Sequence, residues 1–497
     1  MNKKLKNYNP MLMTDFYKVS HKALYPQGTQ KIYSTFTPRG SRVTGVDEVV
    51  MFGLQKFIKE YLVEYFNENF FGLSKSEVLE DYRRVIKYTL GIENPDVNHI
   101  GELHDLGYLP IKVKALKEGT LIPLRIPCLT IENTIDKFFW ITNFLETLIS
   151  CELWQPMTSA TTSLQYRKIV EGYSKETCDN NDHVLFQCHD FSARGMSCMY
   201  SAISSGMGHL LSFCGTDTIP AITGMEKFYN ANIENELVGT SIPATEHSIA
   251  CSYGKDNEFE YYRHIIEDVH PNGLVSLVSD TWSLWNVLTN IIPNLKDKIL
   301  ARDGKVVIRP DSGNPADIIC GDINGKTKIE QQGVVEYLWE LFGGTINSKG
   351  YKVLDSHIGA IYGDSITLER ANEICKRLKE KGFASSNIVL GVGSFSYQYV
   401  TRDTYCFAMK ATYAVVNGEE RKLFKDPITD DGTKKSQKGI VAVIDAFGKP
   451  RLVDDLDEET YNKSYKALDL LEVVYEDGKL IRGEFLSEIR ERLLKVL

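Results

Sequence analysis

Polar side chains able to do chemistry follow a series of short apolar runs in the middle of the chain. They are Asp190, Asp217, Glu246, His247, Asp280, Arg309, Asp311 and Asp364. Carboxylate oxygens are the ligands that Mg²⁺ prefers, so Asp280 and Asp311 could hold that ion directly or through water. Arginine grips a phosphate with two parallel hydrogen bonds, which lysine cannot do, and the run Val306–Ile308 ends at Arg309. This set predicts a site for an anionic, phosphorylated substrate.

Two glycine-bearing turns end the last two apolar runs. Gly363 precedes Asp364, and Gly391-Val392-Gly393-Ser394 follows Leu390. Backbone N–H groups of such turns at helix N-termini bind phosphate, although a plain tight turn has the same sequence. The chain has no Walker A sequence, and Phe395 and Ser396 stand where a dinucleotide fingerprint needs glycine. Basic residues that could add to a phosphate site, or be solvated surface charge, are Arg194, Arg402, Lys410, Lys425, Lys434 and Lys435.

Each of these polar residues also has a structural interpretation. An Asp or Ser after a strand often caps the next helix, and Arg309 could form a salt bridge with Asp280 or Asp311. Capping requires neither Arg309 nor the Glu246-His247 pair, so it does not explain the whole set. No Ser/His/Asp or Cys/His nucleophile set stands beside these residues. We therefore predict that catalysis depends on positioning the reactants and on stabilising the charge that develops during the reaction.

The apolar runs alternate with helical patterns at intervals of about 30 residues, which is typical of parallel βα units. The runs are Val184–Gln187, Leu210–Cys214, a stretch after Thr240, Leu274–Val278, Val306–Ile308, Ile358–Tyr362 and Ile388–Leu390. Seven successive units favour a barrel, complete or open, over a short sheet. In such a barrel the C-terminal strand ends carry the active site. One interval is longer because it contains an insertion near 320–350.

The regions on either side of these units have another pattern. Residues 1–180 mix short strand-like runs with amphipathic helices, and residues after 400 read as hairpins. One hairpin joins Thr412–Val416 to Arg421–Phe424 through the turn Asn417-Gly418, and another pairs Ile440–Ile444 with Pro450–Val453. We expect residues 1–180 and 400–497 to form one discontinuous α+β domain beside an α/β barrel domain at 181–399.

Composition excludes several classes of protein. The 497 residues are 43% hydrophobic and carry a net charge of −9, which argues against general binding to nucleic acid or an anionic membrane. The ten cysteines form no C-x-x-C pair, so they predict reduced thiols rather than a metal knuckle or a disulfide scaffold. No signal peptide and no apolar run approaching ~18 residues is present, so we expect a cytoplasmic protein.

An ordered set of motifs resembles the nicotinamide phosphoribosyltransferase family across nearly the whole chain. The motifs are T-D-x-Y-K-V-x-H (Thr14–His21), H-D-F (His189–Phe191) with Arg194-Gly195, G-T-D-T (Gly215–Thr218), P-A-x-E-H-S (Pro243–Ser248), V-S-D (Val278–Asp280), R-P-D-S-G-N-P (Arg309–Pro315), N-S-K-G-Y-K (Asn347–Lys352), T-R-D (Thr401–Asp403) and F-K-D-P (Phe424–Pro427). The resemblance implies a type II phosphoribosyltransferase fold, an irregular α/β barrel with an α+β domain. It also implies a head-to-tail homodimer with shared active sites.

The reaction implied by the resemblance belongs to NAD salvage. Nicotinamide and 5-phosphoribosyl 1-pyrophosphate give nicotinamide mononucleotide and pyrophosphate with Mg²⁺. ATP hydrolysis would be coupled through a phosphohistidine, His247, with Glu246 beside it. Phe191 and Tyr17 of the partner subunit would sandwich the pyridine ring.

The resemblance assigns the other site residues as well. Asp217 would accept a hydrogen bond from the carboxamide, near Ser241 and either Arg309 or Ser276. The ribose, pyrophosphate and metal would be held by Arg194, Asp280, Arg309 and Asp311. The 5′-phosphate would be held by Gly363, Asp364, Gly393 and Ser394, with Arg402 and Lys410 from across the dimer.

Two other functions compete with this one. Nicotinate phosphoribosyltransferase shares the fold and cosubstrate, but Asp217 facing the carboxylate of nicotinate would repel it. A non-catalytic binding protein on the same fold would have lost the polar residues of the rim, but this chain keeps them. The chain also departs from the family pattern: Ser192-Ala193 replaces Gly-Tyr, Gly393-Ser394-Phe395 replaces a glycine triplet, and Ser365 stands where glycine is common.

Overall fold

The computed structural model describes residues 8–363, 365–426, 428–429 and 436–497. Its contacts divide the chain into two compact units. The first comprises Met1–Thr158, Lys227–Ala231 and Val400–Val496, and the second comprises Ser159–Glu226, Asn232–Tyr399 and Leu497. The first division falls inside one long helix, α6 (Glu146–Thr177), and not near 180. The reason is that Leu153 of this helix packs in the first core, whereas Val170 packs in the second.

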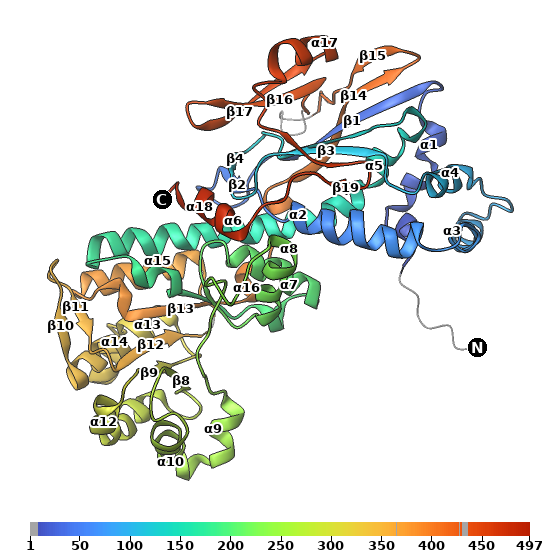
Figure 1. Cartoon of the computed structure of the whole chain (residues 1–497). Helices are drawn as coiled ribbons and strands as arrows, with labels where there is room; N and C mark the ends of the chain where they lie inside the picture. The colour runs from blue at the N-terminus through green and yellow to red at the C-terminus, as the bar shows by residue number, and fades with distance from the viewer. Residues whose placement is uncertain (1–7, 364, 427, 430–435) are drawn as a thin grey trace, which may run out of the picture. The chain divides into compact units, whose positions relative to one another are not determined.

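The first unit is built on a seven-stranded antiparallel sheet of order β15-β14-β1-β5-β3-β18-β19. Figure 1 shows β1 and β14, from opposite ends of the chain, side by side, and their register runs from Thr29↔Val416 to Pro38↔Phe407. The strands of this sheet are β1 (Thr29–Pro38), β3 (Ile111–Ala115), β5 (Leu129–Asn133), β14 (Phe407–Val416), β15 (Glu419–Lys422), β18 (Glu472–Glu476) and β19 (Lys479–Leu480). The α+β character expected of these regions is confirmed.

Smaller elements complete the first unit. Both expected hairpins are present: Asn417 and Gly418, each with positive φ, turn β14 into β15, and β16 (Ile440–Ala446) pairs with β17 (Lys449–Leu456). A two-stranded sheet joins β2 (Glu48–Val50) to β4 (Leu121–Pro123). The α-helices are α1 (His21–Leu24), α2 (Leu54–Phe57), α3 (Lys75–Leu90), α4 (Asn98–Leu106), α5 (Ile141–Phe144), α17 (Glu458–Thr460) and α18 (Leu486–Leu494).

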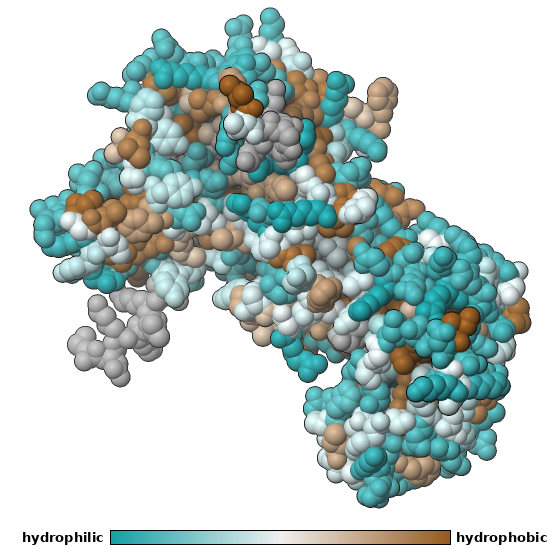
Figure 2. All heavy atoms as spheres, turned by 180° about the vertical axis from the view of Figure 1, so that it is seen from behind, coloured by the Kyte–Doolittle hydropathy of each residue, from teal (hydrophilic) through white to brown (hydrophobic). Residues whose placement is uncertain are grey.

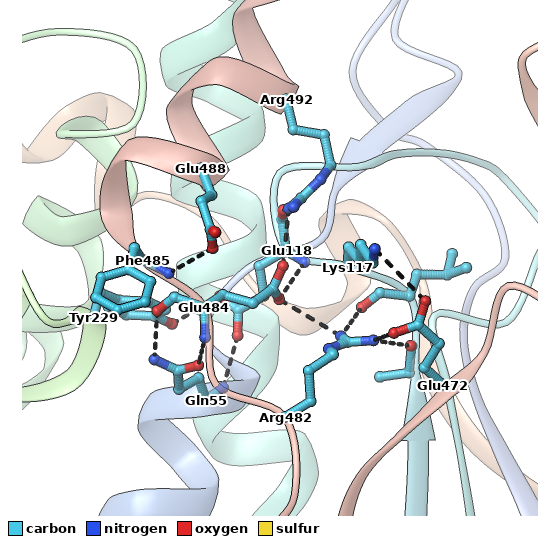
Figure 3. Close-up of polar contacts among 12 residues, drawn as sticks. Gln55, Lys117, Glu118, Tyr229, Glu472, Arg482, Glu484, Phe485, Glu488 and Arg492 are labelled. Atoms are coloured by element: carbon cyan, nitrogen blue, oxygen red, sulfur yellow. Dashed lines mark hydrogen bonds and ion pairs between the residues drawn. The ribbon is translucent and has the colours of Figure 1, made fainter.

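A buried carboxyl cluster attaches the C-terminal segment to this unit (Figure 3). The Glu118 carboxyl accepts hydrogen bonds from the Gly53 N–H at 2.9 Å, the Gln55 N–H at 2.7 Å and the Tyr229 hydroxyl at 2.8 Å. Glu484, which precedes α18, accepts the Glu118 N–H at 2.9 Å. Burial, and then repulsion from Glu484, raise the pKa of Glu118 to about 7.

This raised pKa makes the stability of the first unit pH-dependent. Because the folded pKa lies above the ordinary 4.5, the bound proton stabilises the fold at low pH, and this contribution is lost as pH rises through 7. Relative to Glu118→Gln, we expect the wild-type free energy of unfolding to fall by about 2 kcal/mol between about pH 5 and about pH 8. Urea denaturation of the wild type and of Glu118→Gln across this pH range measures the difference in unfolding free energy. Glu488→Gln is the control for a lost charge on α18, because Glu488 is exposed. Parallel pH curves for wild type and Glu118→Gln would contradict the prediction.

The second unit contains a six-stranded parallel sheet of order β7-β6-β13-β12-β9-β8. Its strands are β6 (Cys188–Asp190), β7 (Gly215–Thr216), β8 (Val275–Val278), β9 (Val306–Arg309), β12 (Ile358–Tyr362) and β13 (Ile388–Val392). The segment Thr240–Ala244 bridges the two edge strands, because Thr240 pairs with Gly215 of β7 and Ala244 pairs with Ser276 of β8. These bridges close the sheet into an irregular barrel and confirm the predicted fold class.

Helices alternate with these strands, as the spacing of the apolar runs predicts. They are α7 (Met199–His209), α8 (Ile219–Tyr229), α9 (His247–Tyr253), α10 (Glu258–Arg263), α11 (Leu284–Asn286), α12 (Ile292–Ala301), α13 (Pro315–Cys320), α14 (Lys328–Phe342), α15 (Leu368–Glu380) and α16 (Ser394–Tyr397). The insertion near 320–350 contains α14 and the start of a hairpin that pairs β10 (Gly344–Ile346) with β11 (Lys352–Leu354).

Apolar side chains of both units lie mainly in their cores. The core of the second unit is lined by strand residues such as Leu277, Ile308 and Leu390, all fully buried. On the face seen in Figure 2, hydrophilic residues predominate and hydrophobic ones appear in small groups. Among the helices of the described residues, none is long and apolar enough to cross a membrane.

Candidate active site

The polar residues that follow the parallel strands meet in one pocket of the second unit. Its volume is about 850 Å³. The lining residues are Phe191, Ala193, Arg194, Gly195, Asp217, Thr218, Ala244, Thr245, Glu246, Ile249, Arg309, Asp311, Gly363, Gly393 and Ser394. The C-terminal ends of parallel strands share one edge of a sheet, which is why residues so far apart in sequence converge.

One wall of the pocket pairs an aromatic ring with a carboxylate. The Asp217 Oδ1 lies 2.8 Å from His189 Nε2 and accepts a hydrogen bond from the Ser241 hydroxyl at 2.6 Å. The ring of Phe191 lies against that of His189, with centroids 4.6 Å apart. Burial opposes ionisation of Asp217, but the hydrogen bonds from His189 and Ser241 outweigh it, so its pKa lies below the ordinary value. Both bonds use Oδ1, so Oδ2 can accept a donor from a ligand.

His189 and Asp190 show what the sequence analysis missed on this strand. His189 received no role, although the two-residue period of a strand places it on the same face as Phe191. Asp190 was expected at the rim, but it is fully buried and does not line the pocket. Its carboxylate instead accepts hydrogen bonds from the Ser192 N–H at 2.9 Å and the Thr218 hydroxyl at 2.8 Å. Asp190 therefore fixes the loops on which Phe191 and Asp217 are carried.

A second polar group joins His247 to the loop after β9. His247 Nε2 lies 3.2 Å from Asp280 Oδ1. The other Asp280 oxygen accepts the Asp311 N–H at 3.0 Å and the Ser312 hydroxyl at 2.6 Å. Burial opposes ionisation of Asp280, but these hydrogen bonds outweigh it and lower its pKa. The arrangement orients the His247 ring through Nε2. Glu246, beside it, accepts a hydrogen bond from the Ser248 hydroxyl.

Arg309 is a partly buried cation that lines the pocket. It ends β9 with a side chain that is 12% exposed, and the nearest carboxylate contact joins its Nε to Asp311 Oδ1 at 3.8 Å. That Nε has no hydrogen-bond partner among the described residues. The ion pair with Asp311 is therefore present but loose, and the guanidinium keeps donors for an anionic ligand.

The metal-binding capacity of the pocket is limited. The described residues contain no group of three His, Cys, Asp or Glu side chains placed to hold a metal ion. Asp311 lines the pocket, whereas the oxygens of Asp280 are occupied by protein donors. Mg²⁺ commonly keeps several waters and binds through one or two carboxylates and the phosphates of a substrate. The donor set fits an ion of that kind.

The glycine turns allow close approaches around the pocket. A Cβ on Gly363 would lie 2.0 Å from Asp311 Oδ1, and one on Gly195 would lie 2.0 Å from Ser394 Oγ. A Cβ on Gly391 would lie 2.7 Å from the Phe191 ring. Gly391 therefore serves packing beneath the aromatic ring, while Gly363, Gly393 and Ser394 line the pocket. Asp364, expected in the same phosphate site, lies outside the described residues.

The remaining expected site residues are not part of the pocket lining. Ser276 is buried in β8, and its Oγ has no hydrogen-bond partner among the described residues. Tyr17, Arg402 and Lys410 belong to the first unit. Tyr17 is 58% exposed and precedes Lys18, which is anchored by an ion pair with Glu146. Burial lowers the pKa of Lys410.

The closed parallel sheet with this pocket at its C-terminal edge defines the class of protein. Two solved structures share the fold: nicotinate-nucleotide pyrophosphorylase from Pyrococcus furiosus and human nicotinic acid phosphoribosyltransferase. The first has a TM-score of 0.57 and 16% identity, covering 100% of this chain and 98% of that chain. The second has a TM-score of 0.54 and 14% identity, covering 97% of this chain and 93% of that chain. The fold is that of the type II phosphoribosyltransferases.

Sequence relatives specify the family. Residues 9–113 match the model of the nicotinamide phosphoribosyltransferase N-terminal domain, and residues 186–479 match that of the nicotinate phosphoribosyltransferase family. The nicotinamide phosphoribosyltransferase of Acinetobacter baylyi is 46% identical over 98% of both chains. That of Mycoplasma pneumoniae is 36% identical over 89% of this chain and 96% of its own. The chain belongs to the nicotinamide phosphoribosyltransferase family.

Proposed function

We propose that the chain transfers the phosphoribosyl group of 5-phosphoribosyl 1-pyrophosphate to nicotinamide, giving nicotinamide mononucleotide and pyrophosphate in NAD salvage. Besides family membership, one observation carries the choice of substrate. The ionised Asp217, held through Oδ1 by His189 and Ser241, presents Oδ2 beside Phe191 in the pocket. A carboxylate accepts hydrogen bonds but donates none, so it suits the N–H groups of a carboxamide and repels the carboxylate of nicotinate.

The chemistry agrees with the residues present. The pyridine nitrogen carries no proton, so its attack on the ribose C1′ needs no general base. As the N–C1′ bond forms, the C1′–O bond to pyrophosphate breaks, and charge develops on the leaving group. Arg309 and Arg194 supply positive charge in the pocket, and Phe191 positions the ring. Mg²⁺ bound with the pyrophosphate would contact Asp311, and Asp280 through water, and would neutralise the leaving group.

A turnover assay with labelled nicotinamide tests the function. Purified protein with phosphoribosyl pyrophosphate and Mg²⁺ should form labelled nicotinamide mononucleotide, and labelled nicotinate should react far more slowly. Preference for nicotinate would identify the competing enzyme. Absence of turnover on both, with binding of nicotinamide retained, would identify a non-catalytic binding protein.

The active site is proposed to be shared between two subunits of a homodimer. An exposed apolar group in the second unit supports an interface next to the phosphate turn: Met199, Tyr200, Phe395 and Tyr399 are each at least 58% exposed. The rings of Phe395 and Tyr399 stack at 5.3 Å, and Gln398 between them accepts the Ser197 N–H at 2.8 Å. Tyr17, Arg402 and Lys410 of the partner subunit would then complete the ring sandwich and the 5′-phosphate site.

Heterodimers offer a direct measurement of this sharing. We expect Tyr17→Ala and Arg309→Ala each to be inactive as homodimers and to recover about a quarter of wild-type activity when co-expressed, because heterodimers carry one intact site. The control is a homodimer in which both chains carry both substitutions. Isolated heterodimers as inactive as either parent would contradict a shared site.

His247 is proposed to couple ATP hydrolysis to the transfer through a phosphohistidine. Asp280 contacts Nε2, so Nδ1 can accept the γ-phosphoryl group of ATP. We expect His247→Ala to abolish ATP hydrolysis and to reduce synthesis in the presence of ATP by at least about tenfold. His264→Ala removes another histidine that contacts an aspartate, Asp268 at 3.1 Å, and should hydrolyse ATP normally. ATP hydrolysis at the wild-type rate by His247→Ala would remove this residue from the role.

A further inference from the structure

A second pocket of the second unit surrounds a cysteine. Its volume is about 340 Å³. The lining residues are Cys178, Asp179, Asn180, His183, Thr345, Ile346, Asn347, Ser348, Val353 and Ser386. Segments 182–186 and 385–387 lead into β6 and β13, so the pocket lies at the N-terminal ends of strands whose C-terminal ends carry the active site. The β10–β11 hairpin of the insertion supplies one wall.

The sulfur of Cys178 lies among hydrogen-bonding groups. Its Sγ is 3.8 Å from His183 Nε2, 3.5 Å from Ser385 Oγ and 3.6 Å from Thr177 Oγ1. The Thr177 hydroxyl donates to the Tyr173 carbonyl at 2.7 Å, so its hydrogen is already used. Among the described residues, the donors left to face the sulfur are the His183 imidazole and the hydroxyls of Ser385 and Ser386. An imidazole and a hydroxyl that donate to one sulfur favour the thiolate.

The charges around the sulfur agree with that ionisation. Burial opposes it, but the hydrogen bonds, that of His183 foremost, outweigh burial and lower the pKa of Cys178 to about 6. Asp179 is the carboxylate in the pocket lining, and it accepts hydrogen bonds from the Ser348 N–H at 3.1 Å and the Ser348 hydroxyl at 2.6 Å. Burial raises the pKa of the nearby Cys375 to about 12, so that thiol stays neutral.

We propose that Cys178 is a covalent modification site that takes low-molecular-weight disulfides from this pocket. The Cys178 thiolate attacks one sulfur of the small disulfide, and the S–S bond of that molecule breaks as the new S–S bond forms. The departing thiolate takes a proton from water. One disulfide replaces another, so no further oxidant is needed, and an added thiol reverses the step.

Other features of the chain separate this site from ordinary cysteines and from a metal centre. Cys178 is 6% exposed, so the pocket is the route by which a small molecule reaches its sulfur. Burial raises the pKa of Cys128 and Cys320 to about 12, which keeps these two thiols neutral and unreactive. The described residues provide no third ligand that would make the Cys178–His183 pair a metal site.

The experiment uses hydroxyethyl disulfide, a small neutral probe, with the full-length protein. The adduct at the Cys178 peptide is followed by mass spectrometry against pH, with the exposed Cys251 as an internal reference for the reagent. In the wild type we expect the rate at Cys178 to rise with a midpoint near pH 6, following its thiolate. His183→Gln should slow the reaction at about pH 6.5 by about fivefold or more, since the thiolate loses its principal donor.

Controls make each outcome decisive. His264→Gln alters a histidine away from this pocket and should leave the rate at Cys178 unchanged, and Cys178→Ser should remove the adduct from that peptide. Equal rates in wild type and His183→Gln would overturn the proposal, as would a Cys178 that stays unmodified while Cys251 reacts. If His183→Gln fails to fold, the wild-type profile decides: a midpoint above about pH 8, usual for a free thiol, overturns the proposal.

Discussion

Replacing Asp217 by Asn should lower the preference for nicotinamide over nicotinate by at least 10²–10³, roughly 3–4 kcal/mol at ~1.4 kcal/mol per tenfold. The donors of His189 and Ser241 both meet Oδ1, so they should hold the amide oxygen of the introduced asparagine as they hold the carboxylate oxygen. The amide nitrogen then takes the place of Oδ2. It donates where the carboxamide of nicotinamide needs an acceptor, and it accommodates the carboxylate of nicotinate.

The measurement is kcat/KM for both substrates in both proteins. Asp355→Asn is a matched control, because Asp355 also contacts a histidine, His357 at 2.7 Å, but does not line the active-site pocket. It should leave the ratio unchanged. A change of less than about threefold in Asp217→Asn, under ~0.7 kcal/mol, would mean that Asp217 has a structural role and does not select the substrate.

Replacing Arg309 by Lys should lower kcat/KM for phosphoribosyl pyrophosphate by about 10²–10³. Lysine keeps the positive charge but loses the planar fork that binds two phosphate oxygens together. The structure supports a role in binding because Arg309 is 12% exposed and its Nε is 3.8 Å from Asp311, too far for a hydrogen bond. A partly buried cation whose ion pair is loose gains more from an anionic substrate than from its protein neighbour.

A matched arginine distinguishes this loss from a loss of stability. Arg377 forms an ion pair with Asp317 at 2.8 Å in the same unit, away from the pocket lining. Arg377→Lys should retain wild-type kcat/KM, and both variants should have their melting temperatures measured. If Arg309→Lys melts far below the wild type but keeps its kcat/KM once folded, Arg309 is a structural partner of Asp311.

The barrel and most of its rim follow from the pattern of residues along the chain. Continuous apolar runs such as Val306–Ile308 are buried on both faces, which is the property of a parallel strand, so their spacing predicted the βα units. The polar residue after each run had to lie at the C-terminal edge, because parallel strands end at the same edge. That geometry alone brought Asp217, Arg309 and Gly363 into one predicted site, and the structure places all three in one pocket.

The direction in which each side chain faces, and the segment that closes the barrel, depend on tertiary contacts. His189 and Asp190 are neighbours and both are buried, yet His189 meets Asp217 beside the pocket whereas Asp190 meets Thr218, because successive residues of a strand point to opposite faces. The segment at 240–244 lies in the stretch after Thr240 that was expected as one of the apolar runs, but its pairs with Gly215 and Ser276, which close the sheet, are not predicted by any local pattern. The Cys178 site likewise needs Ser385, brought from a distant part of the chain by tertiary packing. Local periodicity determines the secondary-structure elements and the edge of the sheet at which each strand ends. The direction of each side chain and the closure of the barrel depend on contacts between residues far apart in sequence.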